Sequence, residues 1–316
     1  MADMATKHQP LAQPIESTPR SVPRRRFSPS YVFLLPTLVI IGFLSLYPIV
    51  YSVVLSLYDW NWGARMNFVG LRNYVNLLSG SEFWQILGQT FYFAVGAVTI
   101  ELTLGLVLAV IVNGLGFGAN LIRTLLLTPL MVSGIVVALI WKVMLDPMLG
   151  IVNYFLSLVG LSPSPFLGSQ ATAMNTIVAI DAWWQTSFVF IILLAGLQSL
   201  PAEPHEAARV DGASPWQTFW HVTLPLLRPV LFTVLIFRTI DTLKVFDIVF
   251  GTTGGGPRLA TEVIQTMTYR TAFSYLQMSQ AMTVMVIFSF VIVMISLVYL
   301  KLESHGEASG RGKGTT

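Results

Sequence analysis

Six long apolar segments constrain the fold of this chain more than any other feature of its sequence. They occupy residues 31–57, 86–112, 119–145, 174–199, 224–249 and 275–300. A helix needs about 20 residues to cross the hydrocarbon core of a bilayer, and each segment is at least that long. Because a backbone in lipid must satisfy its own hydrogen bonds, such segments fold as helices. The sequence therefore predicts an all-α integral membrane protein with six transmembrane helices and both termini on the same side.

Composition agrees with this fold and excludes other classes of protein. Of the 316 residues, 54% are hydrophobic and only 10% are charged, whereas soluble domains carry about a quarter charged residues. The net charge of +3 is too small, and the basic residues are too scattered, to indicate binding to nucleic acid. The chain has no cysteine, which excludes disulfides and thiolate catalysis.

Neither a catalytic site nor a metal site is predicted. The sequence Gly312-Lys313-Gly314 lacks the glycine spacing and the following Ser or Thr of a phosphate-binding loop. We therefore expect no cofactor, ATP included, to bind to this chain. The four histidines lie in the tails or in the loop after residue 200, and none pairs at metal-ligand spacing on an apolar segment. The chain is accordingly predicted not to be an enzyme.

Basic residues predict which side of the membrane holds the termini. With cytoplasmic termini, the inner segments contain Lys7, Arg20, Arg24, Arg25, Arg26, Arg123, Arg209, Arg228, Lys301, Arg311 and Lys313. The outer loops then contain only Arg65, Arg72, Arg258 and Arg270. An excess of positive charge inside favours this orientation. Residues 1–30 and 303–316 are predicted to be disordered cytoplasmic tails, and they flank a membrane domain over residues 31–302.

A charged loop, residues 201–225, separates the fourth and fifth apolar segments. Its first half, around Glu206, has helical composition and ends at Gly212, a residue that suits a turn. Its second half carries aromatic residues at helical spacing. The sequence predicts a short helix, a turn and a second short helix on the inner side of the membrane. An amphipathic loop that only lies on the bilayer is the alternative.

This loop resembles the Glu-Ala-Ala loop of permease subunits from bacterial ABC importers. The family pattern is Glu-Ala-Ala, three residues, Gly, nine residues, Ile, one residue and Leu-Pro, and here Val222 stands in place of the Ile. The matching positions, some of them typical of carbohydrate importers, are Glu206, Ala207, Ala208, Asp211, Gly212, Phe219, Leu224 and Pro225. The resemblance implies that these residues form a coupling helix that docks on a partner ATPase.

The resemblance covers residues 31–302 and includes residues 252–257, which are similar to the family's outer Thr-x-Gly-Gly-Pro element. It identifies the chain as a MalF-like permease with type I importer architecture in the bacterial inner membrane. The implied function is ATP-driven import of a sugar or sugar derivative. The implied partners are a second permease subunit in a heterodimer, two ATPase subunits that bind ATP and Mg, a periplasmic solute-binding protein, membrane lipid and a sugar-like substrate.

Ionisable residues within the apolar segments are functional candidates, because charge inside a membrane is costly. Glu101 is interpreted as a buried carboxyl that bonds to a neighbouring helix, with a substrate role as the alternative. Arg238, Asp241, Lys244 and Asp247 are spaced three apart. They predict either a self-neutralised ladder along one helix or a site where Arg238 or Lys244 meets an anionic or hydroxyl-rich solute.

Aromatic and amide groups in the fourth segment suit a sugar, whose ring face stacks on aromatic side chains while its hydroxyls form hydrogen bonds. An aromatic belt near the outer membrane interface is the alternative. Alignment with the maltose-importer permease implies a substrate path lined by Trp184, Gln185, Phe188, Arg238, Asp241 and Thr242.

The alternative function is that of a secondary transporter or channel for a polar solute, driven by an ion gradient. The charges within the membrane could serve such a protein. That function would not explain the motif in residues 201–225.

Overall fold

The structure is a computed structural model that describes residues 30–62 and 65–311, with side chains described for residues 34–62 and 65–302. Most of the two predicted tails, residues 1–29 and 312–316, lies outside the described residues. The chain divides into two compact units, residues 1–48 and 49–316. The described part of the first unit is the beginning of helix α1 (Ser30–Ser56). Pro36 and Pro48 lie inside this helix, so neither marks one of its ends.

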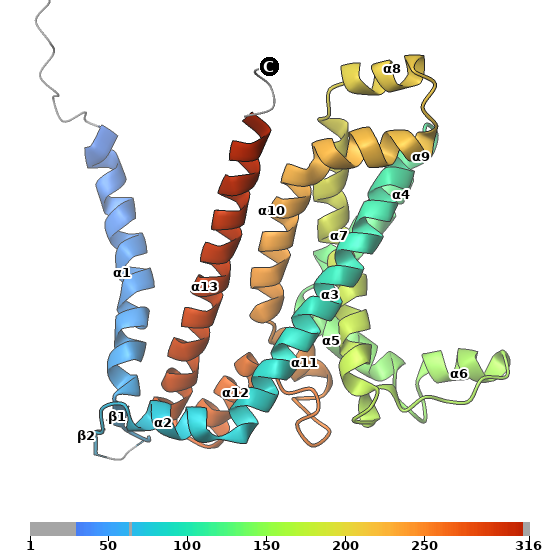
Figure 1. Ribbon diagram of the computed structural model, residues 1–316. Coiled ribbons are helices and arrows are strands. Elements are labelled where there is room, and N and C mark those ends of the chain that lie inside the picture. Colours follow the sequence, from blue (N-terminus) through green and yellow to red (C-terminus); the bar gives the residue numbers. More distant parts are fainter. Residues whose placement is uncertain (1–29, 63–64, 312–316) are drawn as a thin grey trace, which may run out of the picture. The chain divides into compact units, whose positions relative to one another are not determined.

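Long apolar helices form the membrane part of the second unit (Figure 1). They are α3 (Ser81–Asn113), α7 (Ala173–Gln198), α10 (Leu224–Leu243) and α13 (Met278–Arg311). Helix α10 is preceded without a break by α9 (Pro215–Thr218) and the π-helical turn η3 (Phe219–Thr223). Within the described residues, five helices are long and apolar enough to cross a membrane, the stretch Leu34–Ser56 of α1 among them.

The third predicted span, 119–145, is not one straight helix. It consists of α4 (Ala119–Leu127), the 3₁₀ turn η1 (Thr128–Met131) and α5 (Gly134–Met144), with a bend of 96° at the break. Pro129 lies in the turn, and its missing N–H interrupts the helical hydrogen bonds there. Counting the bent pair as one span gives the predicted six.

Short elements connect the long helices. They are β1 (Tyr58–Asp59), β2 (Asn67–Phe68), α2 (Arg72–Ser79), α6 (Ile151–Leu158), η2 (Phe166–Gly168), α8 (Glu203–Val210), α11 (Asp247–Thr252), α12 (Ile264–Tyr269) and the π turn η4 (Arg270–Ser274). The two strands pair antiparallel, with Tyr58 opposite Phe68. Helix α8 lies at one end of the long helices, and α2 and α12 lie at the opposite end (Figure 1).

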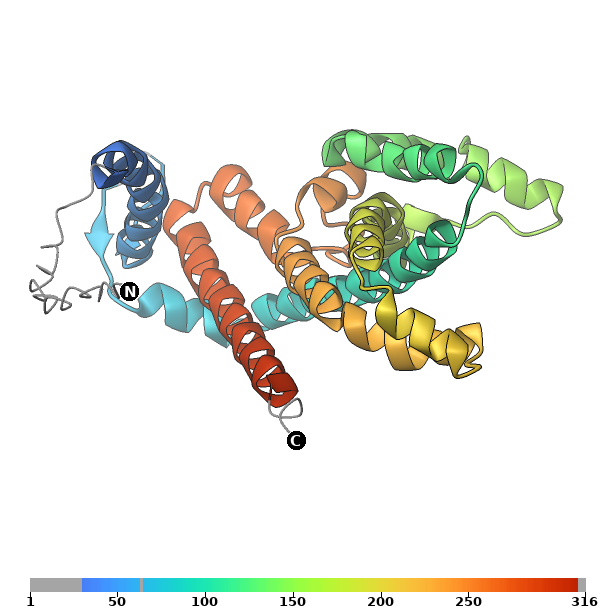
Figure 2. The same ribbon diagram turned by 90° about the horizontal axis from the view of Figure 1, so that it is seen from above.

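Helix α7 is central to the second unit. It contacts α3, α5, α10 and α11, as the view from above shows (Figure 2). Its contact with α3 is close because Gly105 has no side chain, and a Cβ there would collide with Val189 of α7. Small residues allow membrane helices to approach in this way. Apolar side chains around Phe190 and Leu227 then bury the contact between α7 and α10.

Candidate functional site

The inner loop, residues 201–225, folds as a helix, a turn and a second helix, as the sequence predicts. Helix α8 has acidic residues in its first turn and Arg209 in its last turn, an arrangement that complements the helix dipole. Gly212 adopts a positive φ of 75°, which a residue with a Cβ would occupy only with strain. Ser214 then caps α9 and forms a capping box with Gln217.

The second helix of the loop differs from the prediction, because it is not a separate element. It runs through the π turn η3 into α10. Pro225 lies in the first turn of α10, and a proline cannot donate to the carbonyl four residues before it. A single widened turn accommodates this loss of a hydrogen bond without ending the helix. The fifth span is therefore continuous with the inner loop.

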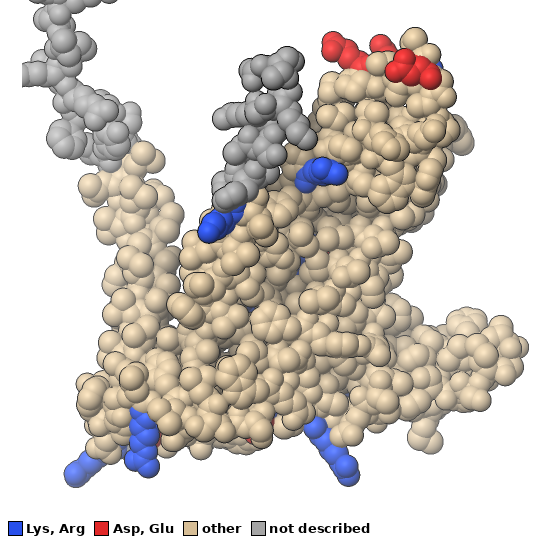
Figure 3. Space-filling view, in the orientation of Figure 1, with Lys and Arg blue, Asp and Glu red and all other residues tan. Residues whose placement is uncertain are grey.

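The predicted coupling residues lie mostly at the surface of this loop. Glu206, Ala207, Asp211 and Gly212 are exposed, whereas Ala208, Phe219, Leu224 and Pro225 are half-buried. The exposed acidic side chains of the loop gather over α8 at the end of the molecule (Figure 3). A partner could reach this acidic face directly.

Arg238 is the centre of a buried ion cluster that joins three membrane helices. Its Nε lies 2.6 Å from Oε2 of Glu101 on α3, and its Nη2 lies 2.9 Å from Oε1 of the same carboxylate. Nη2 also lies 3.2 Å from Asp181 of α7, and Nη1 donates to Asp241 one turn along α10. Arg238 and Glu101 are 2% and 0% exposed. The interpretation of Glu101 as a carboxyl that bonds to a neighbouring helix is confirmed.

The predicted charge ladder on α10 exists only in part. Arg238 pairs with Asp241, but α10 ends at Leu243 and Asp247 begins the separate helix α11. Phe246 breaks the helix with φ −135° and ψ −57°. Among the described residues, Lys244 and Asp247 take part in no ion pair. The ladder was therefore wrong beyond Asp241.

A cavity of about 240 Å³ lies beside the ion cluster. It is lined by Asp181, Trp184, Gln185, Arg238, Asp241, Thr242, Lys244, Val245, Phe246, Asp247 and Ile248. Five of the six predicted path residues are among these. Phe188 is not, because it packs among the apolar side chains between α7 and α10. Trp184 lies near the middle of α7 and donates from Nε1 to the carbonyl of Val132 at 3.1 Å, which argues against an interfacial belt at this tryptophan.

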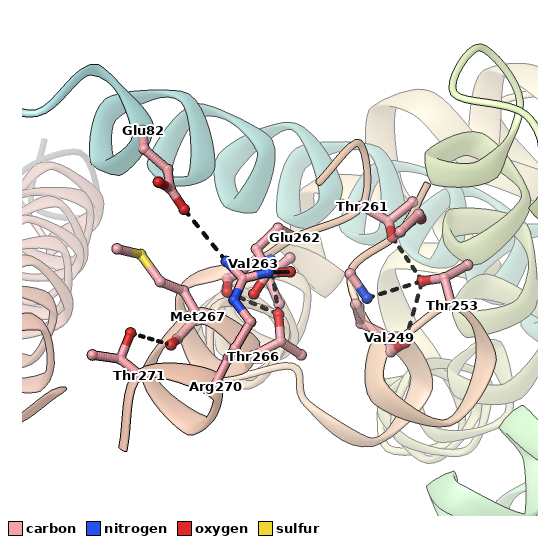
Figure 4. Close-up of polar contacts among 12 residues, drawn as sticks. Glu82, Val249, Thr253, Thr261, Glu262, Val263, Thr266, Met267, Arg270 and Thr271 are labelled. Carbon is pink, nitrogen blue, oxygen red and sulfur yellow. Dashed lines mark hydrogen bonds and ion pairs between the residues drawn. The ribbon is translucent and has the colours of Figure 1, made fainter. Parts of the chain in front are cut away.

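The outer loop, residues 253–274, is tightly interlocked (Figure 4). The hydroxyls of Thr253 and Thr261 lie 2.7 Å apart, and Thr261 also donates to the carbonyl of Gly256. The side chain of Glu262 is fully buried, and its Oε2 accepts from Nη1 of Arg270 at 3.0 Å. Nη2 of Arg270 reaches Glu82 of α3 at 3.4 Å. The Thr-x-Gly-Gly-Pro element is thus fixed to α3.

Burial raises the pKa of the Glu262 carboxyl above its usual value, while the nearby Arg270 guanidinium acts in the opposite direction. Within the described residues, Oε1 of Glu262 has no hydrogen-bond partner. The sequence analysis did not identify Glu262, because the preceding glycines indicated only a turn. A carboxyl followed eight residues later by an arginine was the available signal.

Two further features were not predicted. Asp181 was recognised as polar but not as a partner of Arg238, although any carboxyl within a span calls for such a partner. His205 lies between the carbonyl of Pro201, 3.2 Å from Nδ1, and the hydroxyl of Thr223, 3.1 Å from Nε2. No pattern in the sequence marks this contact.

The fold matches solved permeases. The structure is similar to a chain from "a bacterial ABC transporter involved in the import of the acidic polysaccharide alginate", with a TM-score of 0.77 and 23% sequence identity. The match covers 87% of this chain and 95% of that chain. At this identity the likeness shows the fold alone.

Sequence relatives are closer. The chain is 39% identical over 276 residues to the "Trehalose/maltose transport system permease protein MalF" of Thermococcus litoralis, covering 86% of this chain and 92% of the relative. It is 31% identical to the "Probable starch degradation products transport system permease protein AmyD" of Thermoanaerobacterium thermosulfurigenes, covering 88% and 94%. It is 30% identical to the "Osmoprotective compounds uptake permease protein GgtC" of Synechocystis, covering 85% and 97%.

The family model described as "Binding-protein-dependent transport system inner membrane component" matches residues 101–302. These residues run from the second half of α3 to the end of the apolar part of α13, and they include the inner loop and the Arg238 cluster. The chain belongs to this family and is a multi-pass inner-membrane permease component of a binding-protein-dependent ABC importer.

Proposed function

We propose that this permease conducts a neutral, hydroxyl-rich solute of the sugar class, and that the cavity beside Arg238 is part of its path. The observation that carries the proposal is the chemistry of that cavity. Trp184 and Phe246 supply aromatic faces, Gln185 supplies an amide, and Asp241 and Lys244 supply exposed charged groups. Saccharides are bound by this combination of stacking and hydrogen bonding. The names of the relatives, which concern trehalose, maltose, starch products and osmoprotectants, agree with it.

The hydrogen bonds of Arg238 favour a neutral solute over an anionic one. All three guanidinium nitrogens already donate to carboxylates. An arginine has five N–H groups, so at most one remains for a solute. The cluster holds three carboxylates for one guanidinium, and an anionic sugar would meet excess negative charge. Lys244 at the cavity is the remaining cation.

The coupling chemistry of the proposal lies on other chains. We infer that a second permease completes the path in a heterodimer, that two ATPase subunits carry ATP and Mg, and that the exposed face of α8 docks on one of them. In this proposal the permease itself is not catalytic, and a periplasmic binding protein delivers the solute. Residues 206–225 carry the coupling role.

Energy source separates this proposal from an ion-gradient transporter. Vesicles that contain the assembled transporter should take up solute from its binding protein when ATP is inside and no ion gradient is present. Without ATP, a proton or sodium gradient should drive no uptake. Gradient-driven uptake in vesicles that lack the ATPase would contradict the proposal.

Variants of the cavity test the solute. Gln185→Ala should raise the solute concentration for half-maximal uptake roughly three- to tenfold, the value of one neutral hydrogen bond. Trp184→Ala should have a similar effect through lost stacking. Phe188→Leu, on the same helix but outside the cavity, is the control. Uptake that is unchanged in both cavity variants at matched membrane levels would remove this cavity from the path.

Arg238→Gln tests whether the arginine serves the fold or the solute. The change leaves Glu101 and Asp181 buried without their cation, a loss of about 3–5 kcal/mol when one partner of a buried pair is removed. We therefore expect little folded protein in the membrane. A normally inserted variant with only weaker solute uptake would instead assign Arg238 to the solute.

A further inference from the structure

Helix α8 is weakly attached to the membrane helices. It has no buried side chain. Among the described residues, His205 is the only side chain of α8 that forms a hydrogen bond to another element. A cavity of about 370 Å³ lies beneath the helix, lined in part by His205, Arg209, Asn113 of α3 and Leu197 of α7. Helix α8 therefore has room to move relative to the ends of α3 and α7.

His205 bridges the two ends of the inner loop. Its Nδ1 lies 3.2 Å from the carbonyl oxygen of Pro201, which can only accept, so Nδ1 carries the proton. In the neutral ring Nε2 then accepts from the hydroxyl of Thr223 at 3.1 Å. This contact joins α8 directly to the last residue of the π turn η3.

The π turn is the joint between the inner loop and the fifth span. A π turn has fewer well-formed backbone bonds than an α-helical turn and is a common place for local adjustment. Gly212, on the other side of α9, adds a second flexible point. Movement of α8 would be absorbed at these two points unless a side chain linked α8 to the start of α10.

We propose that His205 is a positioning residue that, through Thr223, transmits displacement of α8 to α10. At its far end α10 carries Arg238, whose partners Glu101 and Asp181 lie on α3 and α7. A shift of α10 would therefore bear on the ion cluster and on the cavity beside it. This inference rests on the proposed coupling role of residues 201–225.

The test measures solute transported per ATP hydrolysed by the complete transporter in vesicles. Thr223→Val keeps the shape of the side chain but removes the hydroxyl, and we expect it to lower this ratio about fivefold, as the loss of one hydrogen bond would. His205→Ala should lower it similarly, and the double variant should be no worse than either single one. Thr223→Ser, which keeps the hydroxyl, should restore the ratio.

The control is Thr233→Val. Thr233 lies on α10, is exposed and bonds only to the carbonyl of Pro229 in its own helix, so its loss should leave the ratio unchanged. An unchanged ratio in Thr223→Val, an equal loss in Thr223→Ser, or additive losses in the double variant would each overturn the inference. If Glu206→Lys stops uptake while Thr223→Val is normal, only the inference fails. If Glu206→Lys is also normal, the proposed coupling role fails as well.

Discussion

The inner loop, residues 201–225, and the outer loop, residues 253–274, have similar roles in the chain but opposite construction. Each connects long apolar helices and contains glycine with positive φ. The outer loop buries Glu262 completely and bonds to α3 through Thr90 and Glu82. In the inner loop, α8 buries no side chain. The comparison indicates a fixed frame outside and a movable element inside, which is where force from an ATPase would arrive.

Two glycines sharpen this comparison and give the largest expected effect on stability. A Cβ at Gly255 would overlap Oε2 of Glu262, whereas a Cβ at Gly212 meets nothing within 4 Å. The carboxylate cannot move aside without breaking its bond to Arg270. Gly255→Ala should therefore cost on the order of 3 kcal/mol, and Gly212→Ala only about 1 kcal/mol of backbone strain. Melting temperatures of the purified transporter would show the difference, and equal losses would contradict the comparison.

The ion pair of the outer loop gives the next effect. Arg270→Gln leaves the buried carboxylate of Glu262 without its cation, and we expect a loss of about 2 kcal/mol. Arg258→Gln is the matched control, because Arg258 is exposed in the same loop, and surface changes usually stay within about 0.5 kcal/mol. Similar melting temperatures for the two variants would show that the pair does not hold the loop.

The smallest effect is a pH dependence. Because burial raises the pKa of Glu262 in the folded state, the folded protein holds this proton more firmly than the unfolded chain does. The contribution of Glu262 to stability is therefore fully present below the unfolded pKa of about 4.3 and decreases as pH rises through the folded pKa. Relative to Glu262→Gln, the parent should lose melting temperature over that interval. A relative gain would have the wrong sign.

The sequence predicts much of this fold because lipid enforces simple rules. Apolar length places α3, α7 and α13 within a few residues of their expected bounds. The third span breaks at Pro129, and the fifth ends early at Leu243. Length and hydropathy alone do not determine such breaks, which depend on local backbone chemistry.

The candidate site was predictable only where a pattern is local. The inner loop follows from the spacing of residues between Glu206 and Pro225. The partners of Arg238 are Glu101 and Asp181, which are far away in sequence, so only the packing of α3 and α7 against α10 reveals them. The tie between His205 and Thr223 likewise depends on how the loop closes.

Coupling through the inner loop is the central claim, and uptake by two variants of the complete transporter tests it most directly. Gly212→Pro cannot adopt the positive φ of 75° at this turn, and Glu206→Lys reverses an exposed charge on α8. Both variants should insert at normal levels and lose ATP-driven uptake from the binding protein. Uptake that survives both changes, with the ATPase still associated, would contradict the account.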